Sequence, residues 1–106
     1  MSIKATKYTL QITVNGHALS TVLIGRHYLV KHGSYMSDEL ILRLVIELDG
    51  GDFPVDSVTL GVDYYVADIQ LDGKEKIYRL IWLFEGESLE VLGVINAYRK
   101  NKGKLS

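Results

Sequence analysis

Strict alternation of apolar and polar side chains marks the first predicted strand, at residues 8–14. A period of two places every second side chain on the same face of a strand. Asn15-Gly16 follows directly, and this pair is typical of a type I′ turn because both of its positions adopt positive φ. Residues 18–24 would form the return strand. The pattern therefore predicts an N-terminal β-hairpin.

A two-residue turn also fixes the faces of this hairpin. It pairs Tyr8 with Leu23 and places both in the core, and it leaves Val22 as an apolar side chain on the opposite face. The strand from Tyr8 to Val14 alternates cleanly and carries few charges, as an unprotected edge strand does. We therefore expect a homodimer or a protein partner at this strand.

The middle of the chain gives a weaker pattern. Residues 27–31 could continue as a short strand, and residues 37–48 and 54–62 are each compatible with a strand or a helix. In the first of these two segments Ser37 would be the N-cap of the helix, but the apolar residues would then cover almost the whole cylinder. A strand from 40 to 48 is therefore preferred.

The C-terminal part of the chain predicts a three-strand antiparallel meander. Its strands span residues 62–71, 76–84 and 89–99. Asp72-Gly73 is a second hairpin signal, between the first two of these strands. The middle strand is apolar on both faces, which is typical of a strand that lies in the centre of a sheet with cover above and below.

Length and composition support one domain, at residues 1–106. Only four alanines occur, whereas β-branched and aromatic residues are plentiful, and these favour strands over helices. The predicted fold is mainly β, with about six antiparallel strands arranged as a sandwich or a partly open barrel and with Trp82 in the core. The alternative is an α+β fold with one or two short helices.

Charge narrows the expected partners. The net charge is −1 at pH 7, so nucleic acid is an unlikely partner by this measure, because nucleic-acid binding favours a basic excess. The sequence has no cysteine, no apolar leader and no apolar run long enough to span a membrane, which predicts a cytoplasmic protein with no membrane contact. The charges are uneven, however, because every charged residue from Arg99 onward is basic. We call Tyr98, Arg99 and Lys100 the basic tail.

One polar residue interrupts the apolar centre of the meander. Arg79 stands in the middle strand, where burying an unpaired charge would be costly. The two predicted turns place Asp68 and Asn96 opposite Ile77, so that both are diagonal neighbours of Arg79. Arg79, Asp68 and Asn96 therefore predict a ligand-binding site for an anion or, alternatively, a structural ion pair.

No metal site and no cofactor is expected. His17, His27 and His32 lack the spacing of converging metal ligands, and no phosphate-binding loop or hydrolase motif occurs. The candidates for chemistry are therefore confined to the meander and the basic tail.

The end of the meander resembles the last two strands of RelE-type toxins. Residues 78–102 share with that family a Tyr-Arg pair with apolar residues, a short turn, an apolar strand, and an aromatic residue followed by basic residues. Members of the family cleave mRNA on the ribosome without a metal ion. The resemblance implicates the matching basic and aromatic residues, Arg79, Tyr98, Arg99 and Lys100. The family also has a helical hairpin before its meander, whereas residues 15–60 here are predicted mainly as strands and loops.

Two functional classes follow from the sequence. The preferred one is a non-enzymatic small binding or protein-interaction module of unknown specificity. The alternative is a RelE-like, metal-independent ribonuclease.

Overall fold

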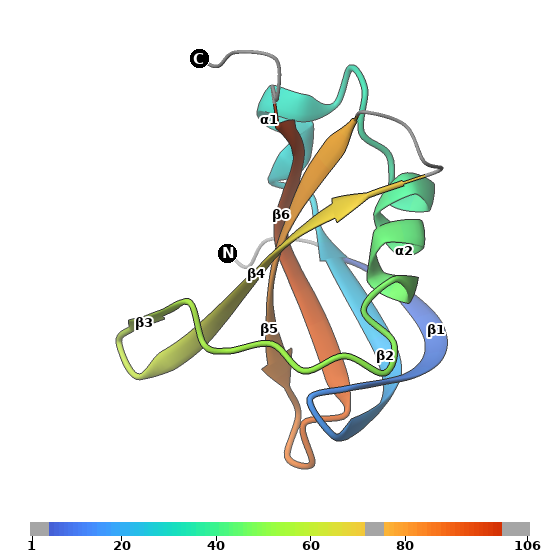
Figure 1. Cartoon of the computed structure of the whole chain (residues 1–106). Helices are drawn as coiled ribbons and strands as arrows, with labels where there is room; N and C mark the ends of the chain where they lie inside the picture. Colours follow the sequence, from blue (N-terminus) through green and yellow to red (C-terminus); the bar gives the residue numbers. More distant parts are fainter. Residues whose placement is uncertain (1–4, 72–75, 101–106) are drawn as a thin grey trace.

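Six strands and two short helices make up the fold (Figure 1). The computed structural model describes residues 5–71 and 76–100. In chain order the elements are β1 (Ala5–Val14), β2 (His17–Gly25), α1 (Tyr28–His32), α2 (Asp38–Ile46), β3 (Ser57–Thr59), β4 (Val62–Gln70), β5 (Ile77–Glu85) and β6 (Val91–Lys100). The mainly β fold class and the number of strands are confirmed.

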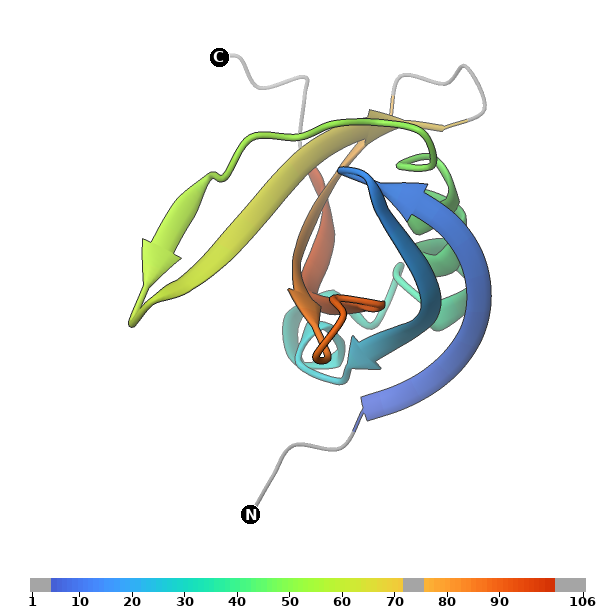
Figure 2. The same ribbon diagram turned by 90° about the horizontal axis from the view of Figure 1, so that it is seen from below.

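The strands form one open, mixed sheet in the order β1-β2-β6-β5-β4-β3. One strand pair departs from the predicted antiparallel arrangement, because β2 and β6 run parallel, from Thr21 opposite Val91 to Ile24 opposite Val94. Parallel neighbours need a long connection, and here it contains both helices and the remaining strands. Figure 2 shows β1 and β2 curving strongly, while the β3–β4 hairpin extends away from the body.

The N-terminal hairpin has the predicted turn but not the predicted faces. Asn15 and Gly16 have φ values of 54° and 78°, as a type I′ turn requires. A β-bulge between Thr9 and Ile12 then shifts the register, so that Tyr8 pairs with Val22 instead of Leu23. Val22 is consequently fully buried, and Leu23 lies on the opposite face of the sheet.

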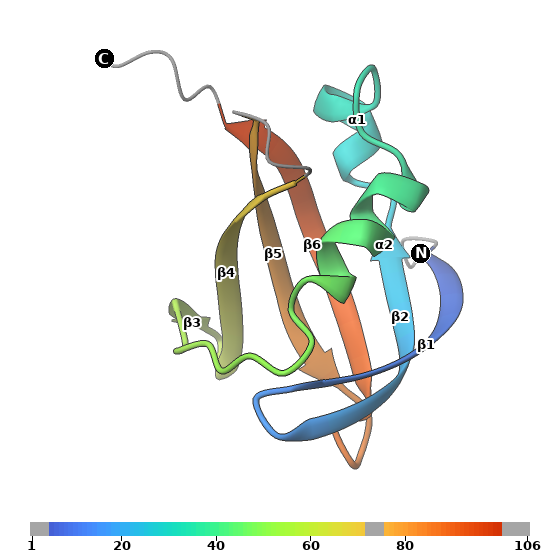
Figure 3. The same cartoon turned by 45° about the vertical axis from the view of Figure 1, so that its right-hand side comes forward.

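Two segments that were read as strands are helical: the strand preferred for residues 40–48 was wrong, and so was the possible short strand at residues 27–31. The segment from residue 27 to residue 31 lies largely in α1, and the segment from 40 to 48 lies largely in α2. Ser37 is the N-cap of α2, and its Oγ accepts a hydrogen bond from the Leu40 backbone N–H at 3.1 Å. The helix tolerates its many apolar residues because the sheet encloses it on one side (Figure 3), leaving a narrow exposed stripe with Glu39 and Arg43.

The meander strands are confirmed, with β5 in the centre between β4 and β6. Trp82 is fully buried in the core. The centroid of its ring lies 5.3 Å from the ring centroid of Phe53 and 5.7 Å from that of Tyr65. The segment 54–62 contains β3 and a turn at Leu60-Gly61. The predicted turn at Asp72-Gly73 lies outside the described residues.

β1 is an edge strand, as expected from its pattern. One part of this edge is covered, because the Thr13 N–H donates to Asp49 Oδ1 at 2.9 Å and the Gly50 N–H donates to the Thr13 carbonyl at 2.7 Å. The partner expected at the rest of this edge stays a prediction. Within the described parts of the chain, no helix is long and apolar enough to cross a membrane.

Candidate functional site

The open face of the sheet, opposite α2, carries the predicted polar residues. Along β5, Tyr78, Leu80 and Trp82 are buried on the α2 side, so Arg79 points to the open side. Arg79 lies directly between Asp68 on β4 and Tyr98 on β6. Three strands therefore bring one carboxylate, one guanidinium and one phenol side by side.

The registers that produce this arrangement differ from the predicted ones. Asp68 is opposite Arg79 itself instead of Ile77, a shift of two residues that preserves the face. Asn96 is opposite Ile81 instead of Ile77. The turn after β5 pairs Phe84 with Leu92 instead of Leu89, and a bulge at Ile95 shifts the ladder by one further residue.

The predicted pairing of Asp68 with Arg79 is present, whereas the predicted role of Asn96 is not. Among the described residues Asn96 makes no hydrogen bond to Arg79. Its Oδ1 instead accepts a hydrogen bond from the Ala97 backbone N–H at 2.9 Å.

Asp68 holds two cations. It accepts hydrogen bonds from Arg79 Nε at 2.8 Å, from Arg79 Nη2 at 3.1 Å and from Lys100 Nζ at 2.8 Å. These hydrogen bonds lower the pKa of Asp68 to about 2, and the bonds from Arg79 have the largest effect. Asp68, and then the Tyr98 hydroxyl, raise the pKa of Arg79 beyond its usual range. The three charged groups form a compact network on a wet surface.

A second group joins this network from α1. The imidazole of His32 stacks on the ring of Tyr98, with centroids 5.2 Å apart and an angle of 28° between the planes. His32 Nδ1 lies 2.8 Å from the hydroxyl oxygen of Tyr35. The guanidinium of Arg99 lies over the Tyr35 ring, 4.6 Å from its centroid, and the Arg99 N–H donates to the Tyr35 hydroxyl at 3.3 Å. We name His32, Tyr35, Arg79, Tyr98 and Arg99 the imidazole cluster.

Sequence reasoning implicated three members of this cluster and missed the other two. His32 and Tyr35 are distant from the meander in the sequence, because Tyr35 and Arg99 are 64 positions apart. No local pattern links such residues, and only the packing of α1 against β6 brings them together.

The imidazole cluster has the groups that phosphodiester chemistry needs. Guanidinium groups bind phosphate through several parallel hydrogen bonds, and imidazole is the commonest protein group for proton transfer. Within residues 5–71 and 76–100, no set of three His, Cys, Asp or Glu side chains is placed to hold a metal ion.

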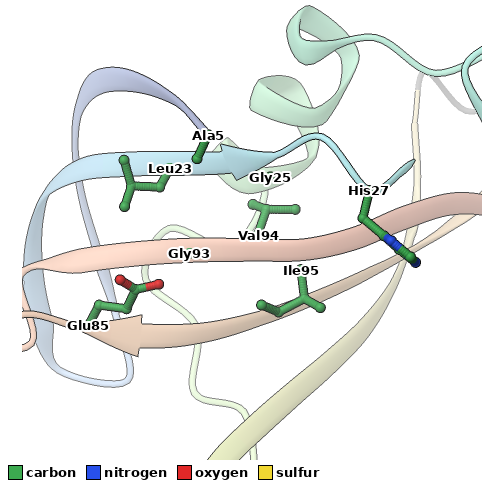
Figure 4. A pocket seen from close by; sticks show the side chains of 8 residues that line it. All are labelled: Ala5, Leu23, Gly25, His27, Glu85, Gly93, Val94 and Ile95. Atoms are coloured by element: carbon green, nitrogen blue, oxygen red, sulfur yellow. The ribbon is translucent and has the colours of Figure 1, made fainter. Parts of the chain in front are cut away.

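A groove lies on the same open face, along β6 and next to β2 and β5 (Figure 4). Its volume is about 490 Å³, and the side chains that border it include Leu23, His27, Glu85 and Ile95. Neither the groove nor the imidazole cluster can be assigned by likeness. In comparisons with known proteins, no family model, no curated protein and no solved structure matches this chain.

Proposed function

We propose that the chain is a metal-independent ribonuclease that resembles RelE-type toxins and acts through the imidazole cluster. The observation that carries this proposal is the stacking of His32 on Tyr98, beside Arg79. An imidazole and a guanidinium therefore both neighbour the Tyr98 side chain. A role on mRNA agrees with the cytoplasmic location expected from the sequence.

The order of elements supports the proposal. The resemblance implies two helices between a first strand and a meander, and here α1 and α2 lie between β2 and the β4–β6 meander. The extra strand β1 pairs only with β2, at the far edge of the sheet. It therefore leaves the meander and the cluster untouched.

The distribution of charge also supports RNA as the partner despite the net charge of −1. Arg79 and Lys100 on the open face, and Arg99 on the α2 side of the same strand pair, lie at one end of the sheet. Acidic Asp56 and Asp63 lie instead at the β3–β4 hairpin, which extends in another direction (Figure 1). Phosphate contacts depend on the local field at the binding surface and not on the charge of the whole chain.

The proposed reaction is the transfer of a phosphodiester to the neighbouring 2′-hydroxyl. In the tautomer that carries its proton on Nδ1, His32 donates to the Tyr35 oxygen, and the lone pair on Nε2 takes the proton of the attacking 2′-oxygen. The new bond between this oxygen and phosphorus displaces the 5′-oxygen of the next nucleotide, and the Tyr98 hydroxyl donates the proton that this oxygen requires. Arg79 stabilises the charge on phosphorus-bound oxygens. The products are a 2′,3′-cyclic phosphate and a free 5′-hydroxyl.

The proposal is tested by incubating the purified protein with free RNA and with ribosome-bound mRNA. We expect cleavage that leaves 2′,3′-cyclic phosphate ends. His32→Ala should slow cleavage by roughly 100-fold or more, while His17→Ala, at the far end of β2, should leave the rate unchanged. The absence of cleavage from both substrates by a folded protein would overturn the proposal.

A non-enzymatic binding module is the second candidate, and one observation favours it. Asp68 already pairs with Arg79 and Lys100 and cancels one of their two positive charges, which lowers the attraction of these cations for a further anion. In this case the open face binds its ligand without changing it. Saturable binding of an RNA oligonucleotide that stays intact, weakened by Arg79→Ala, would support this second candidate over the first.

A further inference from the structure

The groove on the open face has an unusual floor. Gly25 and Gly93 lie there without side chains, and a Cβ placed on Gly93 would collide with the carboxylate of Glu85. The carboxylate therefore rests on the bare backbone of β6. Leu23 and Ile95 form apolar walls, and Ile95 is 38% exposed although it is apolar. A flat, apolar slot of this kind suits a planar ring.

Glu85 is the acidic group of this slot. Within the described residues it makes no hydrogen bond and no ion pair, so both of its carboxylate oxygens are available to a ligand. A carboxylate is an acceptor only, and it binds most tightly to two parallel N–H donors.

We propose that the groove binds a guanine nucleotide of the RNA strand, with the base against Glu85. Guanine is the RNA base whose Watson–Crick edge presents two adjacent N–H donors, N1–H and N2–H. Adenine and cytosine place acceptors beside their amino groups, and uracil has one N–H between two carbonyls. This inference rests on the proposed function, because it takes RNA as the source of the nucleotide.

His27 indicates the direction of the strand. Its imidazole borders the end of the groove opposite Glu85 (Figure 4), where it faces the sugar-phosphate of a bound guanine nucleotide. His27 and His32 are five residues apart across α1, which is roughly 8 Å at the rise of a helix. The strand therefore passes from the groove directly to the imidazole cluster, so that cleavage is expected next to a guanosine.

The test is a titration of the intact protein with guanosine 5′-monophosphate, followed by NMR of backbone amides. We expect the amide signals of Gly25, Gly93 and Ile95 to shift, and adenosine 5′-monophosphate to bind at least 10-fold more weakly. Glu85→Gln should weaken guanosine monophosphate binding by about 10-fold or more. Glu87→Gln, an exposed carboxylate in the next turn, is the matched control and should bind as the native protein does.

Cleavage of RNA substrates that contain a single guanosine separates the two proposals. Cleavage without preference for guanosine, or equal binding of the adenosine nucleotide, overturns the guanine subsite and leaves the ribonuclease standing. Binding of guanosine monophosphate that depends on Glu85, without cleavage of any RNA, supports the subsite and overturns the ribonuclease.

Discussion

Asp68 lies directly opposite Arg79 across β4 and β5, and both of its carboxylate oxygens accept hydrogen bonds from the same guanidinium. The two side chains remain 36% and 35% exposed, respectively. Water therefore screens the charges of this ion pair, which contributes little to the stability of the fold. Its main effect is to orient the Arg79 side chain.

Replacement of Asp68 measures how much this ion pair contributes to the stability of the fold. We expect Asp68→Ala to lower the free energy of unfolding by up to about 1 kcal/mol, because the cations that it leaves unpaired reach solvent. Urea unfolding provides the measurement, with Asp63→Ala on the exposed part of β4 as the control. A loss of about 3–5 kcal/mol would mean that Arg79 is in effect a buried charge.

Acid should remove the same stabilisation gradually. The pKa of Asp68 is about 2 in the folded protein, below the value of about 3.9 in an unfolded chain. The contribution is therefore complete above about pH 4 and disappears as the pH falls towards 2. Unfolding free energies measured across this range should fall more steeply for the native protein than for Asp68→Asn. Parallel curves for the two proteins would contradict the assignment.

A tyrosine gives the opposite dependence at high pH. Tyr28 is 4% exposed and donates a hydrogen bond of 2.6 Å to Asp38 Oδ1, while Tyr8 donates to Oδ2 at the same distance. Burial, and then the bond to Asp38, raise the pKa of Tyr28 to about 12.

The unfolded value is about 10, so the stabilisation from Tyr28 is present below about pH 10 and lost towards 12. The native protein should lose more stability over this range than Tyr28→Phe, as followed by circular dichroism. Tyr64→Phe is the control, because the phenol of Tyr64 makes no hydrogen bond within the described part of the chain. An equal loss in the native protein and in Tyr28→Phe would show that burial and the bond to Asp38 do not raise the pKa of Tyr28 in the folded protein.

The turn between β3 and β4 contains a residue poorly suited to its conformation. Leu60 has a φ of 53° and is 97% exposed, so it adopts a left-handed conformation without any packing in return. Asn tolerates this conformation better than Leu. Leu60→Asn should therefore raise the free energy of unfolding by about 1 kcal/mol. Urea unfolding provides the measurement, and an unchanged or lower free energy of unfolding for Leu60→Asn would refute the argument.

Turns were predicted better than registers. Asn15-Gly16 identified the first hairpin because its two residues are selected by the backbone conformation itself. The bulges near Leu10 and at Ile95 left no comparable trace, because an extra residue in a strand changes neither composition nor period in a recognisable way. The faces of β2 were consequently wrong beyond Leu19.

The helices could not be identified from amphipathicity. α2 exposes only a narrow stripe, so its sequence resembles a strand that is apolar on both faces. The N-cap Ser37 was the more reliable signal, since it reports a backbone requirement that does not depend on how much of the helix is buried.

The candidate site was predictable only where it is local. Counting along the meander identified Asp68 and Arg79. The predicted register was wrong by two residues, but both side chains still lie on one face because side chains on a strand share a face every two residues. His32 and Tyr35 reach the site through tertiary packing alone. These two members of the imidazole cluster were therefore the ones that no spacing rule could provide.

The parallel contact between β2 and β6 has a consequence during synthesis. The first hairpin can close within microseconds, but β2 acquires its second neighbour only when residues 91–94 have been made. At typical translation speeds this delay is roughly 3–13 s. Tyr98 and Arg99 belong to the same late strand, so the imidazole cluster cannot assemble before β6 has been made. Completion of the sheet and assembly of the imidazole cluster are therefore expected to be one event.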